Sequence, residues 1–222
     1  QYMSSTHIGY FLNNILPFRA GDLGRAKLLS DHSKRMKFSF LVGSLVAEKI
    51  IDLWIIGFFS IFIIFLGYQD ILGFNFSLII LLLYIITTAI IFGENSIVNK
   101  IQEKFSITKN FIDGYLLVSE NKIKLGIISL MLWCSFVVYI FLILQSLNIN
   151  LTIQQYLGLT IISSIVTSLP IAPAAIGTYH LAVIYCLSLY EINIDLAQTT
   201  AILMHSLFLV YTIIFGYIFL SF

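Results

Sequence analysis

Four long runs of apolar residues divide the 222-residue chain, and few polar side chains interrupt them. A helix rises about 1.5 Å per residue, so about 20 mostly apolar residues are needed to cross a hydrocarbon layer about 30 Å thick. The four runs meet that length. They predict membrane-spanning helices at residues 39–66, 73–93, 125–147 and 197–220.

Two further apolar regions, residues 4–30 and 156–190, are interrupted near their centres by LPFRAG at 16–21 and LPIAPAAIG at 169–177. Proline lacks a backbone donor and disfavours helix in the residue before it, so each region should form two short helices joined by a turn. Halves of about 13 residues are too short to cross a bilayer comfortably and favour re-entrant hairpins. Broken spanning helices are the alternative.

The 12 lysines and arginines orient these elements, because they cluster before residue 39 and within residues 94–124. Lys49 is the exception, and no lysine or arginine follows Lys124. Loops rich in Lys and Arg stay in the cytoplasm, which places the C-terminus there and gives the two interrupted regions opposite orientations.

These assignments describe an inverted-repeat arrangement, in which Pro/Gly-broken segments occupy corresponding places in two halves. We expect a single transmembrane domain over residues 1–222, with a first half (1–93), a surface-lying cytoplasmic linker helix (94–124) and a second half (125–222).

Composition supports this assignment, since 59% of the residues are hydrophobic and 10% are charged. Soluble domains average about 45–50% apolar and about 25% charged residues. The expected fold class is therefore an all-α polytopic membrane protein. A net charge of +1 without a long run of basic residues argues against nucleic acid as a partner. The cysteines and histidines show no metal-ligand spacing, so neither a metal nor a cofactor is expected.

Two carboxylates interrupt the first predicted spanning helix, where Glu48 and Asp52 lie four residues apart on one face. A charge at the bilayer centre costs about 2.5–3.5 kcal/mol on insertion scales. In one interpretation the carboxylates neutralise Arg19, Arg25 or Lys49 and fix the positions of helices. In the other they line a hydrated cavity that holds a zwitterionic or cationic head group.

Each interrupted region carries its own ionisable residues. Asp22 and Arg25 follow the first break at i, i+3, and Arg19 lies in the turn. A helix start attracts anions and arginine grips phosphate, which suits a lipid phosphate. The alternative is a dipole-favoured aspartate with cytoplasmic anchors. In the second half, His180 and His205 are either packed, hydrogen-bonded residues or proton carriers.

Three motifs occur in order along the chain: NILPFRAGDLGR at 14–25, EKIID at 48–52 and SLPIAPAAIG at 168–177. Together they resemble the lysylphosphatidylglycerol synthase transmembrane region family, the flippase-like membrane domain of the multiple peptide resistance factor. His180 and His205 depart from that pattern, which usually has Glu and often Arg there. The resemblance implies movement of a lipid or lipid-linked head group between leaflets, and further helices ahead of the first motif.

Function is therefore expected to be that of a lipid flippase or translocase of the plasma membrane and not of an enzyme. Two alternatives remain: a non-catalytic membrane subunit that assembles a lipid or glycan synthase, and an intramembrane transferase acting on a polyprenyl phosphate. Expected partners are membrane lipids, a second copy of the chain and such a synthase. The candidate substrate-binding residues are Asn14, Arg19, Gly21, Asp22, Arg25, Glu48, Asp52, Pro170, Pro173, Gly177, His180 and His205.

Overall fold

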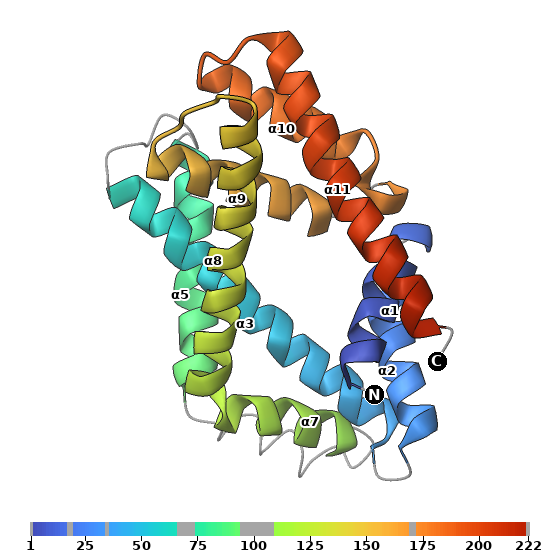
Figure 1. The fold of residues 1–222 in the computed structure, drawn as a ribbon. Coiled ribbons are helices and arrows are strands. Elements are labelled where there is room, and N and C mark those ends of the chain that lie inside the picture. The colour runs from blue at the N-terminus through green and yellow to red at the C-terminus, as the bar shows by residue number, and fades with distance from the viewer. Residues whose placement is uncertain are drawn as a thin grey trace.

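The computed structural model describes residues 2–16, 20–33, 36–65, 74–93, 109–168 and 172–220, and within these ranges the regular structure is helical (Figure 1). The elements are α1 (Tyr2–Ile15), α2 (Ala20–His32), α3 (Phe38–Phe65), α5 (Phe74–Phe92), α7 (Lys109–Glu120), α8 (Lys122–Ser146), α9 (Ile153–Ser168), the short 3-10 helix η3 (Pro173–Ala175), α10 (Thr178–Leu189) and α11 (Ile194–Leu220). The predicted helical fold class is confirmed for the residues described.

Long helices α3, α5, α8 and α11 lie at the four places where spanning helices are predicted. In the described part, Lys122–Ser146 and Ile194–Phe219 are long and apolar enough to cross a membrane. Only 22% of the most apolar window of each is buried inside the chain, so most of these side chains face outward, as a lipid environment requires. The four-span arrangement as a whole stays a prediction.

Two of the long helices begin a few residues before the apolar runs that predicted them. α8 begins at Lys122 and α11 at Ile194, three residues before each predicted start. Backbone hydrogen bonding continues through polar residues at a helix end, whereas the length criterion counts apolar residues. An aspartate in the first turn of α11, Asp195, also suits the positive end of the helix dipole.

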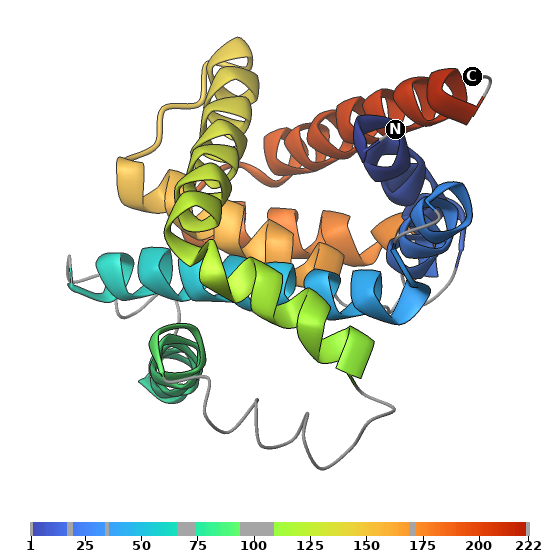
Figure 2. The same ribbon diagram turned by 90° about the horizontal axis from the view of Figure 1, so that it is seen from below.

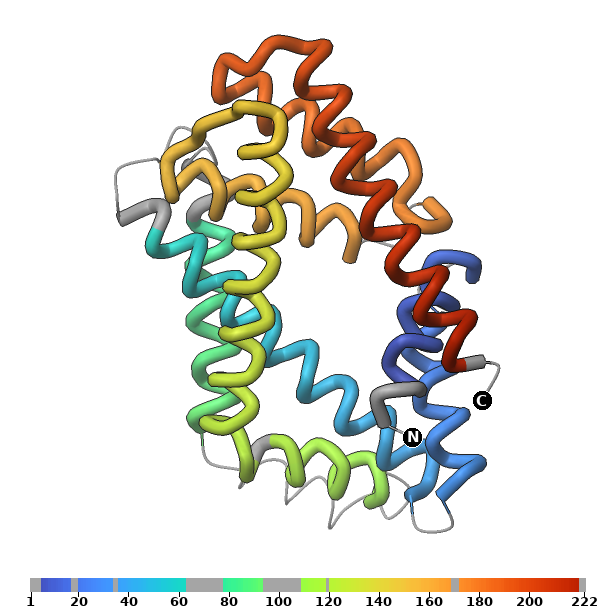
Figure 3. The backbone as a smooth tube through the Cα atoms, viewed as in Figure 1, coloured from blue at the N-terminus to red at the C-terminus, as the bar shows by residue number. Residues whose placement is uncertain are grey.

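In both interrupted regions one helix ends and another begins on either side of the predicted break (Figure 3). In the first, α1 and α2 run antiparallel and touch through glycine. A Cβ added to Gly21 would strike the backbone of Gly9 and Asn13. In the second, α9 ends at Ser168, and η3 precedes α10. Whether the two hairpins are re-entrant stays a prediction.

Close contact between α3 and α7 is a feature that the sequence did not predict. A Cβ on Gly43 would collide with the carbonyl of Phe111, and a Cβ on Gly114 would collide with the carbonyl of Phe40. Glycine on both helices therefore allows the two backbones to touch. The predicted surface-lying linker helix is described from residue 109 onward, and there it packs directly on α3.

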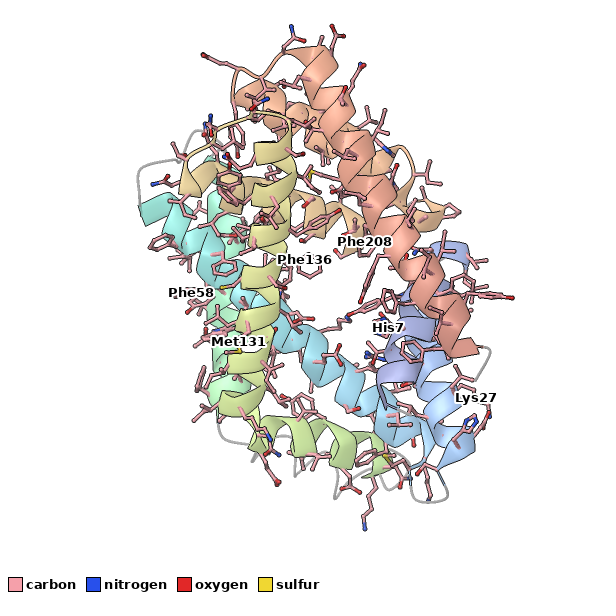
Figure 4. All side chains as sticks on the ribbon, in the orientation of Figure 1. His7, Lys27, Phe58, Met131, Phe136 and Phe208 are labelled. Carbon is pink, nitrogen blue, oxygen red and sulfur yellow. The ribbon has the colours of Figure 1, made fainter. Side chains whose placement is uncertain are left out.

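Helix α1 packs along the C-terminal part of α11, and this contact joins the two predicted halves (Figures 1 and 2). The His7 ring stacks on Phe215 and Phe219, with ring centroids 5.5 and 5.1 Å apart. A Cβ on Gly216 would collide with the side chain of Phe11. Figure 4 shows His7 between the two helices.

Two buried clusters hold the remaining helices together. The larger lies in the second half, and its fully buried side chains include Leu144, Leu159, Val183, Leu187 and Met204. The second joins α3 to α9 through Ile51, Ile55, Phe59, Leu157 and Ile161. Helix α3 thus contacts α2, α5, α7, α8 and α9, and any charge on it must be accommodated among these neighbours.

The glycine contact between α3 and α7 predicts a stability difference between two alanine variants. Gly114→Ala should lower the free energy of unfolding by about 1–3 kcal/mol, because the added methyl group overpacks the helix crossing. Gly126→Ala on α8 is the control, since a Cβ there meets nothing within 4 Å, and it should be neutral or stabilising by up to about 1 kcal/mol. Unfolding of the purified protein in detergent measures both, and equal stability of the two variants would contradict the tight crossing.

Candidate functional site

An ion pair between α2 and α3 forms the centre of the first site. Arg25 Nη2 lies 3.3 Å from Glu48 Oε1 and 3.0 Å from Oε2. The Arg25 side chain is 11% exposed and that of Glu48 is 46% exposed. Of the two described cations considered for Glu48, Arg25 is the closer partner and Lys49 is the more distant one. Hydrogen bonds to charged groups are strong, so this pair holds the first hairpin on α3.

Two further charged residues of α3, Lys49 and Asp52, lie beside Glu48. Together with Asp22, Arg25 and Glu48 they form what we call the charged group. Lys49 Nζ is 3.9 Å from Glu48 Oε1 and 4.0 Å from Asp52 Oδ2, which is the outer limit for an ion pair. Asp52 Oδ1 accepts a hydrogen bond of 2.7 Å from Ser129 Oγ on α8. Asp52 is therefore fixed by its neighbour helix, whereas the Lys49 ammonium is held only loosely.

Asp22 at the start of α2 is tied to α1 through Asn13. The Asn13 amide donates from Nδ2 to Asp22 Oδ1 at 3.2 Å, and the Asp22 backbone N–H donates to Asn13 Oδ1 at 3.2 Å. Asn14, the residue that the sequence motif favours, instead donates to Thr212 Oγ1 on α11 at 2.6 Å. Helical phase decides which of the two adjacent asparagines faces α2.

An open groove of about 310 Å³ lies between α2 and α3, next to this charged group. Its α3 wall is a single helical face, since the lining positions recur three and four residues apart. Apart from Asp22 and Lys49, its lining is apolar: Leu23, Val42, Leu45, Val46, Ile50 and Leu53. The groove therefore combines an apolar wall with one carboxylate and one ammonium.

The formal charges of the described residues in the charged group do not sum to zero. Asp22, Glu48 and Asp52 supply three negative charges, and Arg25 and Lys49 supply two positive charges, which leaves a net charge of −1. Arg19, also predicted for this site, lies outside the described residues.

The second site lies where α10 and α11 meet η3. His205, 3% exposed, has Nε2 2.9 Å from the Ala174 carbonyl oxygen, and its ring stacks on Tyr179 with centroids 4.8 Å apart. The His180 ring stands edge-on to His205, again with centroids 4.8 Å apart. Gly177, at a positive φ of 84°, donates its N–H to His180 Nδ1 at 3.3 Å.

Most of the described site residues separate into two groups, one on α2 and α3 and one on η3, α10 and α11, whereas Asn14 lies on α1 and bonds to α11. Among the described residues, no hydrogen bond or ion pair joins the first group to the second. Pro173 begins η3 and lies in the second group, Gly21 serves the α1–α2 contact, and Pro170 lies outside the described residues. Sequence reasoning missed Asn13 and Ser129, and Ser129 carried no local signal because its partner is 77 residues away.

Within the described ranges, no three His, Cys, Asp or Glu side chains gather where they would hold an ion. The carboxylates of the first group are instead engaged by arginine, asparagine and serine.

Comparison with known proteins yields one family and one relative. The family described as the lysylphosphatidylglycerol synthase TM region matches residues 1–216. A UPF0104 membrane protein of Methanocaldococcus jannaschii is 30% identical over 206 residues, which cover 87% of this chain and 85% of that protein. No solved structure matches the chain significantly.

The Arg25–Glu48 ion pair should be measurable as a coupling energy. Alanine variants of the two residues, made singly and together, are expected to give a coupling of about 1–2 kcal/mol in the free energy of unfolding, because the guanidinium is buried and Glu48 is partly screened. The exposed Lys27–Asp31 pair, 2.7 Å apart on α2, is the matched control and should give about 0.3–0.5 kcal/mol. Equal couplings for the two pairs would show that Arg25 and Glu48 do not hold the hairpin in place.

Proposed function

The chain belongs to the lysylphosphatidylglycerol synthase transmembrane region family of membrane proteins, and from this premise we propose that it moves a phospholipid or lipid-linked head group between leaflets. Family membership supports a function connected with membrane lipids. The leaflet-to-leaflet movement is our inference from the site on α2 and α3.

One observation carries the proposal: the groove between α2 and α3 is apolar, open, and bordered by charged groups. A polar head group needs polar partners while it passes through hydrocarbon, because leaving charge unpaired there is costly. Lys49 and Asp22 supply such partners on the groove wall. The apolar residues of the same wall suit an acyl chain, so an amphiphile fits this surface better than a wholly polar solute.

Head-group chemistry follows from the charges. The loosely held Lys49 ammonium suits a phosphate. Asp22 has a second carboxylate oxygen, Oδ2, with no hydrogen-bond partner among the described residues, and it suits an amine. Because the described group has a net charge of −1, we propose a lipid whose head carries a positive charge, either zwitterionic or cationic.

Transport explains this site better than catalysis does. A general acid–base pair needs carboxyl groups aimed at a reacting atom, whereas Glu48 and Asp52 are engaged by Arg25 and Ser129.

In the proposed arrangement the protein lies in the plasma membrane with a cytoplasmic C-terminus. The α1–α2 and α9–α10 hairpins then enter from opposite faces between four spanning helices. A partner synthase or a second copy of the chain is compatible with this role.

Leaflet exchange in vesicles reconstituted with the purified protein tests the proposal. Fluorescent phospholipids with zwitterionic, cationic and anionic heads are trapped chemically as they reach the outer leaflet. Val46→Trp, which fills the groove, and Lys49→Met, which removes its ammonium, should each slow exchange at least about tenfold, the loss expected for about 1.4 kcal/mol of binding or barrier energy. Folding of each variant is checked by its unfolding transition.

Matched controls lie on surfaces away from the groove. Leu142→Trp adds the same ring on α8, where Leu142 is 60% exposed, and Lys27→Met removes an exposed ammonium from α2. Both should exchange lipid like the unaltered protein. If all four variants exchange lipid at one rate, or if the unaltered protein moves no lipid, the proposed transport is wrong.

A further inference from the structure

Hydrogen bonding at the His180–His205 pair determines where the imidazole protons lie. The Ala174 carbonyl can only accept, so His205 Nε2 carries a proton. The Gly177 backbone N–H can only donate, so His180 Nδ1 presents a lone pair. His180 is therefore neutral in this arrangement, and a proton added to its Nδ1 would displace Gly177.

Charged side chains are scarce around the pair. Helices α1, α9, α10 and η3 contain no Asp, Glu, Lys or Arg, and the one charged residue of α11, Asp195, lies ten residues before His205, about 15 Å along the helix. Lys122 and Lys124 lie at the far end of α8 from Tyr139, which contacts α11.

The titratable groups that face the pair are tyrosines. Tyr179 stacks on His205, and the Tyr139 hydroxyl donates to the Met204 carbonyl at 2.6 Å. Other described titratable side chains on the helices packed here are Tyr156 on α9, Tyr10 and His7 on α1, Cys134 on α8, Tyr185 and Cys186 on α10, and Tyr211 and Tyr217 on α11. Phenols stay protonated where imidazoles titrate, so a proton taken up here belongs to histidine.

We propose that the His180–His205 pair is a binding site for one proton, which a hydronium ion donates, leaving water, and which bonds to Nδ1 of His180 as the Gly177 N–H leaves that nitrogen. No bond is oxidised or reduced. The site lies apart from the α2–α3 groove and does not depend on the proposed lipid movement.

His180 accepts the proton in preference to His205 because its ring is less buried. His205 is 3% exposed, so a charge on its ring would lose nearly all of its hydration. His180 is only partly buried, and protonation there sacrifices one long hydrogen bond of 3.3 Å. Once His180 is charged, a second proton on a ring whose centroid lies 4.8 Å away is opposed by like-charge repulsion.

Proton binding has a structural consequence in the turn before α10. Ala174 and Ala175 have positive φ angles of 51° and 55°, and Gly177 one of 84°. Non-glycine residues keep such conformations only while their surroundings hold them. Loss of the Gly177 bond removes one restraint from this turn, while the His205–Ala174 bond is retained. Because η3 packs on α1, the change reaches the first half of the chain.

Nuclear magnetic resonance of the protein in lipid nanodiscs, with 15N-labelled histidine and glycine, tests the proposal directly. As the pH is lowered, His180 Nδ1 should change from an unprotonated to a protonated shift before His205 does. The Gly177 amide should move with the same midpoint, and His205 should stay neutral through that transition. His180→Phe keeps a ring and removes the lone pair, so its Gly177 amide should not respond to pH.

Exposed His32, at the C-terminal end of α2, provides the control. His32→Gln should leave the His180 and Gly177 curves unchanged. The proposal is overturned if both rings of the pair charge together, if His180 Nδ1 is already protonated at high pH, or if the Gly177 amide ignores the His180 titration. These readouts do not require lipid movement, so failure of the proton site and failure of transport are separately visible.

Discussion

Charge on an apolar helix is the constraint on which this structure depends. Helix α3 carries Glu48, Lys49 and Asp52 within a segment that is otherwise almost entirely apolar. Placing such groups in hydrocarbon without partners is costly, and neighbouring helices supply what is missing. Arg25 reaches Glu48 from α2, and Ser129 reaches Asp52 from α8. The contacts that compensate these charges also hold the α1–α2 hairpin in position on α3. The site is therefore assembled by the same contacts that neutralise its charges.

Glycine makes that arrangement sterically possible. Close approach at Gly21 brings α1 against α2, which lets Asn13 hold Asp22 beside the groove. The reciprocal contact of Gly43 and Gly114 brings α7 onto a different part of α3. Helices that approach this closely gain dispersion contacts along their backbones, which replaces the hydrophobic driving force that lipid surroundings do not provide. Small residues therefore hold α3 in place while its charged face remains available.

The two halves make corresponding links with different chemistry. In the first half, an ion pair joins the second helix of the hairpin to the following long helix, between residues 23 positions apart. In the second half, His180 and His205 join α10 to α11, and the link is a ring contact with hydrogen bonds to the turn. Arginine and glutamate stay charged at physiological pH, whereas imidazole changes its charge there. The first half thus uses a link between opposite charges, and the second half uses a link between two imidazole rings.

Sequence by itself determined the helices, their breaks and the family, because apolar length, proline and glycine act locally and the motifs are contiguous. It also marked Arg25, Glu48 and Asp52 as residues that need partners. Only the tertiary structure decided which partners they have: Arg25 for Glu48, and Ser129 for Asp52. These pairings depend on which face each helix presents and on contacts between segments far apart in the chain. A local sequence pattern contains neither kind of information.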